Sequence, residues 1–258
     1  MRHPMLDHYD RVKQAPGVAH SNLYALDLAA YQAQLGQDDQ VWMSPHSLLV
    51  KRHEPAFDRI EFLTKDIADL QSLLIRHRRR AEIMEWIGSS HQKTELIQLW
   101  RPCMAYHRCL MRMSLRVAGA PVTAPPPTLA SPSDLPVLRE FFDIAFDPWA
   151  ERVPGVHELE DLVATHNILV SRSDNGALRG FMIRTRTGRT LHLRYLFVDP
   201  NFRGQRVGED LFAQFRADAK TGDRLILWVF PDNPVAISLY QKHGFASDGT
   251  VNYIFKSN

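Results

Sequence analysis

Cysteine is scarce in this chain, which holds only two among its 258 residues, Cys103 and Cys109. Two cysteines cannot form a disulfide framework, and no Cys–His cluster has zinc-site spacing, so we expect no bound metal. An excess of charge of one sign is also missing, because 31 Lys and Arg against 29 Asp and Glu leave a net charge of +2. This balance excludes a polybasic nucleic-acid binder.

Long apolar runs are absent as well. No run approaches the roughly 20 residues of a membrane span, and the first residues lack the apolar core of a signal peptide. Hydrophobic residues still make up 45% of the chain and charged residues 23%, which is typical of a globular protein. We expect a cytoplasmic protein of one large or two small domains, with no membrane and no nucleic acid as partner.

Proline is concentrated in one place, because six of the sixteen prolines lie within residues 121–136. Such a run cannot continue a helix or a central strand, since each proline lacks the amide hydrogen and fixes φ. We therefore predict a first domain over residues 1–120, an extended linker over 121–132 and a second domain over 133–258. One long surface loop within a single domain is the alternative.

The second half predicts an α/β domain from its alternating periodicities. One helix is predicted to begin near Ser133, and three more are predicted at 158–166, 207–219 and 233–243. Strands are predicted at 168–171, 178–185, 191–198 and 225–229, followed by a closing hairpin of 245–247 and 250–256. The first half predicts strands at 47–52, 58–63, 81–87 and 104–115, and helices near 67–75 and 94–100. The order of strands and helices from residue 58 matches the order from residue 190. This match indicates an internal duplication, unless it arises by chance.

The residues before about 38 give a weaker pattern. Leu23, Leu26, Leu28 and Tyr31 suggest a helix. We expect the first twenty residues to be loosely ordered, as chain ends often are.

A loop with two glycines and two arginines follows the strand predicted at 191–198 and leads into an amphipathic helix. Amides at a helix N-terminus carry partial positive charge, and glycine lets a phosphate approach the main chain. The loop therefore predicts an anion site, with a plain turn and solvated arginines as the alternative. Its residues are Arg203, Gly204, Gln205, Arg206, Val207 and Gly208.

A second motif occupies residues 233–245. Asn233 suits a helix N-cap, Pro234 the first helical position and Gly244 a left-handed exit. Together with the loop, this motif resembles the GNAT superfamily of acyl-CoA-dependent N-acyltransferases. Residues 203–208 are similar to the pyrophosphate loop of that family, and Asn-Pro-x-Ala-x-x-Leu-Tyr-x-Lys-x-Gly-Phe is similar to its second cofactor motif. The resemblance covers about residues 129–258.

Together with the internal duplication, the resemblance implies tandem GNAT-like folds, the first of them degenerate, each a mixed, mostly antiparallel sheet flanked by helices. It implies that strands 191–198 and 225–229 form a central parallel pair that holds the pantetheine arm of acetyl-CoA, the expected co-substrate. Phe197 and Val198 would contact this arm, with an amide at or beside Val198 on the thioester carbonyl. The loop over 203–208 would hold the pyrophosphate, and Asn233 would contact the cofactor from the second motif.

Two residues match catalytic positions of the family. Tyr240 lies where many members place a general acid, and a phenol of pKa about 10 suits a departing thiolate; an aromatic residue that only fills the core is the alternative. His192 lies where some relatives place a catalytic glutamate, and a pKa near 6.5 suits a base. Strand alternation puts His192, Arg194 and Leu196 on one face, which leaves open whether His192 points to the cleft.

One position departs from the family pattern, because Arg206 stands where the loop has a glycine. If this position needs a positive φ, the arginine is strained by about 1–3 kcal/mol. In an ordinary helical conformation, the guanidinium could instead add a charge-assisted contact to a phosphate.

We therefore predict an N-acetyltransferase that moves acetyl from acetyl-CoA to a primary amine, by direct attack because no cysteine lies near the motifs. We favour a small-molecule amine; a protein or peptide acetyltransferase and a non-catalytic acyl-CoA sensor are alternatives, and a homo-oligomer stays open. An acidic stretch favours a cationic amine if it walls the acceptor site, or is only a solvated surface; its members are Asp143, Asp147, Glu151, Glu158, Glu160 and Asp161. The first half has no glycine after strand 58–63 and carries Asp66 there, so we expect no cofactor in it.

Overall fold

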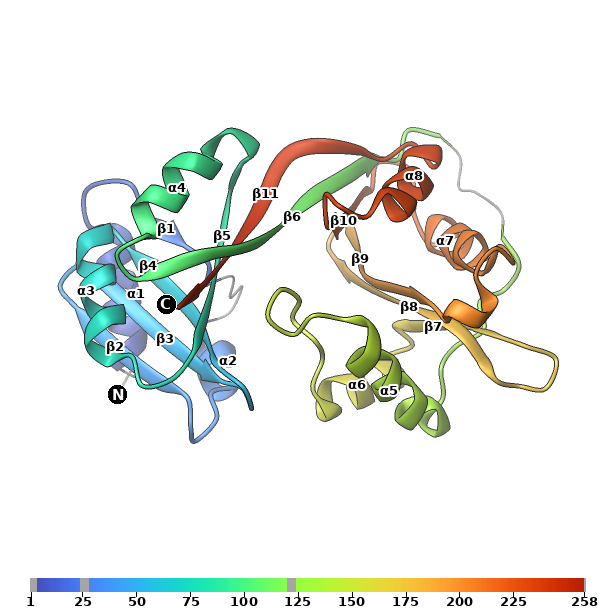
Figure 1. Ribbon diagram of the computed structural model, residues 1–258, viewed down its shortest axis with the longest axis horizontal. Helices are drawn as coiled ribbons and strands as arrows, with labels where there is room; N and C mark the ends of the chain where they lie inside the picture. Colours follow the sequence, from blue (N-terminus) through green and yellow to red (C-terminus); the bar gives the residue numbers. More distant parts are fainter. Residues whose placement is uncertain (1–3, 24–27, 120–123, 258) are drawn as a thin grey trace. The chain divides into compact units, whose positions relative to one another are not determined.

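The structure is a computed structural model that describes residues 4–23, 28–119 and 124–257. The chain forms two compact units, unit 1 from residues 1–109 with 250–258 and unit 2 from residues 110–249. Each unit has a mixed sheet with helices on both faces (Figure 1). The tandem α/β architecture predicted from the sequence is confirmed.

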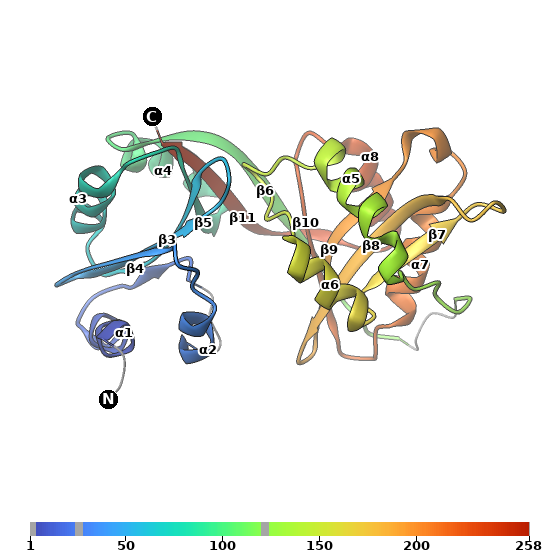
Figure 2. The ribbon, with the colours of Figure 1, turned by 90° about the horizontal axis from the view of Figure 1, so that it is seen from below.

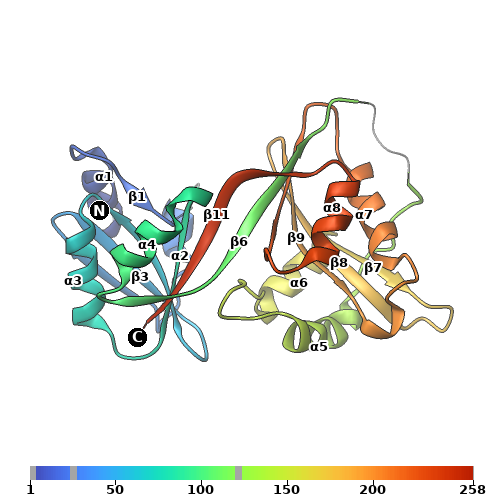
Figure 3. The same cartoon turned by 45° about the horizontal axis from the view of Figure 1, so that its top comes forward.

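The sheet of unit 2 has the strand order β6-β10-β9-β8-β7. The pair β9–β10 is parallel and the other pairs are antiparallel, so the predicted central parallel pair is confirmed. Helices α7 and α8 pack on one face, and α5 and α6 pack on the other (Figure 3). The bounds are β6 (Met104–Arg116), β7 (Ile168–Arg172), β8 (Leu178–Thr187), β9 (Thr190–Val198), β10 (Arg224–Val229), α5 (Leu135–Ala145), α6 (Val156–Ala164), α7 (Val207–Ala217) and α8 (Pro234–Lys242).

The sheet of unit 1 has the order β2-β3-β4-β5-β11, with β4 and β5 parallel and a short β1 paired to β4. Helix α1 and the short α2 lie on one face, and α3 and α4 lie on the other (Figure 2). The bounds are β1 (His20–Ser21), β2 (Gln40–Ser44), β3 (Ser47–His53), β4 (Asp58–Thr64), β5 (Glu82–Ser89), β11 (Ala246–Ser257), α1 (Pro4–Gln14), α2 (Leu28–Ala33), α3 (Ile67–His77) and α4 (Lys93–Trp100). Short 3₁₀ turns lie at Ser90–Gln92, Pro132–Asp134 and Pro200–Phe202.

The two repeats exchange their last strands. The order β4-α3-β5-α4-β6 returns as β9-α7-β10-α8-β11, as the duplication predicts. Residues 111–116 of β6 nevertheless pair with β10 in unit 2, and residues 250–256 of β11 pair with β5 in unit 1. Figure 1 shows the red end of β11 next to β5. Each sheet is therefore completed by a strand from the other repeat.

Two expectations from the sequence are wrong. The closing hairpin is one strand, β11, in which Gly249 takes a φ of +79° without reversing the chain, because residues 250–256 continue into unit 1. The first twenty residues include the ordered helix α1, whose Met5, His8 and Val12 are buried on the sheet. Leu26, part of the early helix pattern, lies outside the described residues.

The prolines do not mark the division between the units, which falls within β6 and β11. Of the predicted linker 121–132, residues 121–123 lie outside the described part. Residues 128–130 run beside β7, where Ala130 donates its amide to Ile168 O at 3.0 Å and Val170 donates its amide to Thr128 O at 2.9 Å. The predicted domains 1–120 and 133–258, with the linker 121–132 between them, stay a prediction.

The strand exchange predicts that a change near the C-terminus loosens unit 1. Phe255 is fully buried against Trp100 and Tyr106 of unit 1, so Phe255→Ala should cost about 3–5 kcal/mol and speed amide hydrogen exchange in β5. Phe245→Ala, a matched change in the core of unit 2, should speed exchange in β10 instead. If Phe255→Ala instead speeds amide hydrogen exchange in β10 and not in β5, the pairing of β11 with unit 1 would be contradicted.

Candidate functional site

The two parallel strands of unit 2 separate before they end. Their register runs from Thr190 with Arg224 to Leu193 with Leu227 and stops there. Strand β9 then continues beside β8, and β10 continues beside β6 to Val229. We call the space between the two ends the β9–β10 opening. The backbone groups that face it have no neighbouring strand.

A β-bulge at Arg194 decides which way the end of β9 faces. Strand β8 pairs Ile183 with Tyr195 and Arg184 with Leu193, so Arg194 is the extra residue. An extra residue reverses the alternation of side chains along the strand. The side chains beyond Arg194 therefore point to the opposite face of the sheet from the one that strict alternation along β9 predicts.

The hydrophobic cores show this reversal directly. Leu191 and Leu193 are buried in the core under α7 and α8, and Leu196 packs against the same core. His192 therefore faces α5 and α6, on the other side of the sheet from Leu196. The expectation that His192, Arg194 and Leu196 share one face is wrong for Leu196, because the bulge adds one residue.

The bulge also directs the amides at the end of β9. Asp199 donates its amide to Arg179 O on β8 at 2.9 Å. Because backbone groups alternate along a strand, Phe197 also faces β8, whereas the amides of Leu196 and Val198 face the β9–β10 opening. Among the sequence-predicted contacts, Val198 thus presents its amide to the opening, and Phe197 presents its ring to the core under α5 and α6.

The loop after β9 presents a row of amides. Within the described part of the chain, the amides from Gly204 to Glu209 donate no hydrogen bond to a backbone carbonyl. The loop residues Arg203, Gly204, Gln205 and Arg206 are exposed, and the row ends in the first turn of α7. Unpaired amides at a helix N-terminus favour an anion.

Gly208 leaves room that the protein itself does not fill. A Cβ built on Gly208 would lie 3.5 Å from Cγ2 of Val198 and 3.9 Å from Cδ2 of Leu239, which are ordinary contact distances. Glycine costs about 1 kcal/mol relative to alanine inside a helix. Packing within the chain therefore does not require a glycine here, and the space suits a ligand that lies against the backbone.

Of the two conformations that the sequence left open for Arg206, the structure has the strained one. Its φ is +62° and its ψ is 7°, in the left-handed region, and it is the residue before α7. Gly204 also has a positive φ, of +76°. The loop thus keeps a backbone shape suited to two glycines, although arginine stands at the second position.

The residues of the second motif lie on α8. Asn233 caps the helix, because its side chain accepts a hydrogen bond from the amide of Ala236 at 3.1 Å. Tyr240 is buried, with its ring 5.4 Å from that of Phe212, and burial raises the pKa of its phenol above the ordinary value. The phenol is therefore protonated at neutral pH, which both a general acid and a core aromatic require.

His192 and Arg194 lie on the opposite face of β9 from α7. Burial, with a smaller contribution from the nearby Arg194 cation, lowers the pKa of His192 to about 4. The Arg194 guanidinium is in turn 2.7 Å from the Glu158 carboxylate on α6. At neutral pH, His192 is therefore uncharged beside an ion pair.

The acidic stretch of α5 and α6 is partly neutralised. Glu158 pairs with Arg194, Asp143 lies 3.4 Å from Arg139, and Glu160 lies 3.1 Å from His157. Of these three acids, only Glu158 reaches a residue of the sheet. The contacts favour the solvated-surface interpretation for Asp143 and Glu160.

Among residues 4–23, 28–119 and 124–257, no group of three His, Cys, Asp or Glu is placed to hold a metal ion. No helix in those ranges is long and apolar enough to cross a membrane.

Comparison with known proteins identifies the domain that carries this site. Residues 135–245 match the acetyltransferase (GNAT) family. Unit 2 carries a GNAT acetyltransferase domain. No curated protein matches the chain.

Solved structures extend the likeness to both units. A GCN5-related N-acetyltransferase from Sphaerobacter thermophilus superposes with a TM-score of 0.62 at 13% identity, covering 90% of this chain and 82% of that one. One from Kribbella flavida gives 0.59 at 14% identity, with 89% and 94% covered. A tandem GNAT protein from the clavulanic acid biosynthesis pathway gives 0.53 at 12% identity, with 82% and 78% covered. At these identities the likeness concerns the fold alone, which is a tandem of GNAT folds.

The GNAT domain has two features that the sequence did not reveal. They are the bulge at Arg194 and the amide of Leu196, which faces the opening beside that of Val198. The run Leu193-Arg194-Tyr195 contains no glycine or proline that would signal an irregular strand. Only the pairing with β8 shows which residue is extra.

The left-handed Arg206 predicts a stabilising substitution. Arg206→Gly should raise the free energy of unfolding of unit 2 by about 1 kcal/mol, because glycine adopts a positive φ without steric cost. The neighbouring change Gln205→Gly should lower it, since Gln205 has no positive φ and glycine only adds disorder to the unfolded chain. Urea unfolding measures both, and equal effects of the two changes would contradict the strain.

Proposed function

We propose that unit 2 transfers an acetyl group from acetyl-CoA to the primary amine of a small molecule. The observation that carries this proposal is the row of unpaired amides that begins in the β9–β10 opening at Leu196 and Val198 and continues from Gly204 to Glu209. A long ligand with amides at one end and phosphates at the other matches such a row. Membership of residues 135–245 in the acetyltransferase family supports the acyl donor.

The loop residues suit the diphosphate of the donor. The amides from Gly204 to Glu209 would hold its oxygens at the positive end of α7. The open space over Gly208 admits the group to the backbone. The exposed guanidinium groups of Arg203 and Arg206 add positive charge at the same place. Asn233 would contact the donor from the start of α8.

The amide of Val198 would stabilise the charge that develops during transfer. As the amine nitrogen attacks, negative charge grows on the thioester oxygen, and a fixed N–H aimed at it lowers the barrier. The new C–N bond forms as the C–S bond breaks and the thiolate leaves. Tyr240 would give its phenolic proton to that thiolate, for which a protonated phenol is required.

His192 is our candidate for the group that accepts the amine proton. It lies on the face of β9 toward α5 and α6, opposite the core of α7. Its lowered pKa keeps the imidazole uncharged at neutral pH, so its free nitrogen can accept a proton. The same lowered pKa makes the imidazolium short-lived, so the proton would pass on to solvent rather than stay.

A panel of amines tests the proposed activity. Release of free thiol from acetyl-CoA in the presence of single amines measures transfer, and the panel includes small cationic amines and peptides with lysine or a free N-terminus. Turnover with small amines supports the proposal. Turnover with peptides alone would reassign the acceptor, and donor binding without turnover would indicate a sensor.

Gly208 gives a binding test with a built-in control. Gly208→Gln should weaken acetyl-CoA binding at least tenfold in calorimetric titration, because a long side chain fills the space over the loop amides. Gly208→Ala should weaken binding less than Gly208→Gln, since a methyl group fills less of this space and meets only ordinary contacts within the chain. Equal affinity of the native protein and both variants for acetyl-CoA would contradict the assignment of the loop to the acetyl-CoA site.

Tyr240 gives a catalytic test. Tyr240→Phe should lower kcat at least tenfold with little change in KM for acetyl-CoA, because the ring still packs on Phe212 while the proton is lost. Tyr253→Phe is the control, as it removes a hydroxyl whose hydrogen bond to Ser89 O, 2.7 Å long, lies in unit 1. Equal rates for the native chain and Tyr240→Phe would assign Tyr240 to the core alone.

A further inference from the structure

The end of the unit 1 sheet that corresponds to the β9–β10 opening of unit 2 is filled by the chain itself. The pairing of β4 with β5 stops at Ile60 with Met84, and Asn22 bridges the two strands beyond that point. Its side-chain amide donates to Ile60 O and Glu85 O, both at 2.9 Å, and its side-chain oxygen accepts from the amide of Phe62 at 2.7 Å. A ligand of unit 1 would therefore bind elsewhere.

The opposite end of the same strands carries a cavity of about 380 Å³. Its walls come from the turn before β2, from the end of β3 and the start of β4, and from the segment between α3 and β5. Among the described residues, every side chain that lines it is polar. Sites for drug-like ligands are mostly lined by apolar side chains, so this cavity suits a small and strongly polar molecule.

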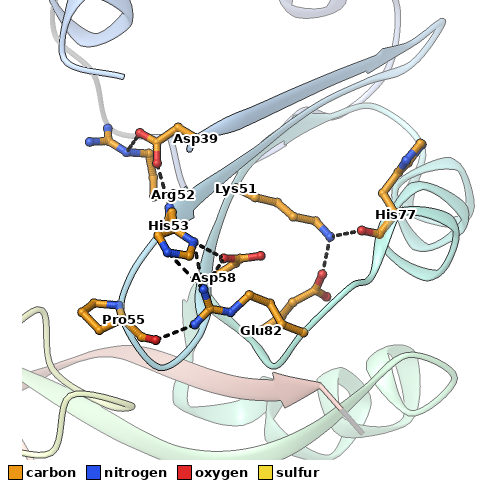
Figure 4. Close-up of polar contacts among 9 residues, drawn as sticks. Asp39, Lys51, Arg52, His53, Pro55, Asp58, His77 and Glu82 are labelled. Atoms are coloured by element: carbon orange, nitrogen blue, oxygen red, sulfur yellow. Dashed lines mark hydrogen bonds and ion pairs between the residues drawn. The ribbon is translucent and has the colours of Figure 1, made fainter. Parts of the chain in front are cut away.

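Three of the lining side chains bind one another. Nη1 of Arg80 lies 2.8 Å from Nδ1 of His53 and 3.7 Å from the Asp58 carboxylate, and the His53 ring lies 3.3 Å from the same carboxylate (Figure 4). Arg80 also donates to Pro55 O at 2.8 Å. The charges of Arg80 and Asp58 therefore neutralise each other, and these side chains form a fixed part of the wall.

The charges next to the cavity are also paired within the fold. The Asp39 carboxylate accepts from the amide of His53 at 2.7 Å and lies 2.7 Å from the Arg52 guanidinium (Figure 4). Lys51 on β3 and Glu82 on β5 form a fully buried ion pair. These contacts fix the turn before β2 and the ends of the strands, so the walls are in place before any ligand binds.

Arg79 and Asp38 are the charged lining residues that the fold does not use. The contacts of Arg78 and Arg80 hold the chain on either side of Arg79, and Asp38 precedes the fixed Asp39 in a turn. Within the described ranges, neither side chain has a hydrogen bond or an ion pair. They do not pair with each other either, although both line the same cavity. The cavity thus presents an unpaired cation and an unpaired anion.

This arrangement selects a ligand that carries both charges. Asp38 repels a simple anion and Arg79 repels a simple cation, whereas a zwitterion satisfies both side chains. We propose that the cavity binds a free amino acid, with its carboxylate on Arg79 and its ammonium group on Asp38. The side-chain amides of Gln37 and Gln40, which also line the cavity, both donate and accept hydrogen bonds and suit a neutral polar side chain. The proposal rests on unit 1 alone.

Heteronuclear NMR titration of the full chain without acetyl-CoA tests the ligand class. The probes are glutamine, asparagine, serine and threonine, and at least one of them should shift the amides around Asp38 and Arg79 in a saturable way. The N-acetyl form and the carboxamide form of that amino acid should each bind about tenfold or more weakly, because each lacks one of the two charges. Equal binding of either form would overturn the proposal in favour of a plain anion or cation site.

Two variants test the assigned residues. Arg79→Gln and Asp38→Asn should each weaken binding by about tenfold or more while leaving Tm unchanged, since both side chains are exposed and unpaired. Arg76→Gln, a change at an exposed arginine of α3 that does not line the cavity, should bind like the native chain.

The proposal is overturned if none of the four amino acids binds saturably, or if Arg79→Gln or Asp38→Asn binds as tightly as Arg76→Gln. Acetyl transfer does not enter these measurements. A failure of the proposed function of unit 2 would therefore leave this result unchanged, and a failure here would leave the function of unit 2 untouched.

Discussion

The separation of a parallel strand pair after three or four residues is the constraint on which both units depend. Each strand of the pair keeps its outer neighbour, so the inner backbone groups at the separating ends lose their partners. Buried amides without acceptors are costly, and a fold that keeps this opening must supply an occupant. Unit 1 supplies Asn22 from its own chain, whereas in unit 2 the loop amides from Gly204 to Glu209 make no backbone hydrogen bond within the described residues.

Burial shifts the pKa values of the two candidate catalytic groups of unit 2 in opposite directions, and both groups are uncharged as a result. It lowers the pKa of His192 to about 4 and raises the pKa of the Tyr240 phenol, so both are uncharged at neutral pH. Neither side chain therefore carries a charge before the reaction. Next to His192, Arg194 and Glu158 form an ion pair in which the two charges neutralise each other. In the proposed reaction, fixed backbone amides rather than ionised side chains would stabilise the developing charge.

Much of unit 2 could be predicted from the sequence because its elements have strong local signals. Asn233 and Pro234 mark the start of α8, and the missing glycine at Arg206 raised a positive φ as one of two possible conformations. The bulge at Arg194 had no such signal, since only cross-strand register reveals an extra residue. The strand exchange was hidden for a similar reason, because β6 and β11 follow equivalent helices and their alternation is the same in either sheet.

The exchanged strands also determine the order in which the two sheets can be completed during synthesis. Residues 250–256, which close the sheet of unit 1 beside β5, leave the ribosome only after all of unit 2. Until then, β5 is an open edge with unpaired backbone groups, the kind of surface that promotes aggregation. Unit 2, in contrast, has every strand of its sheet by residue 229, since β6 precedes it. The half that comes first in the sequence is thus the last to be completed in a nascent chain.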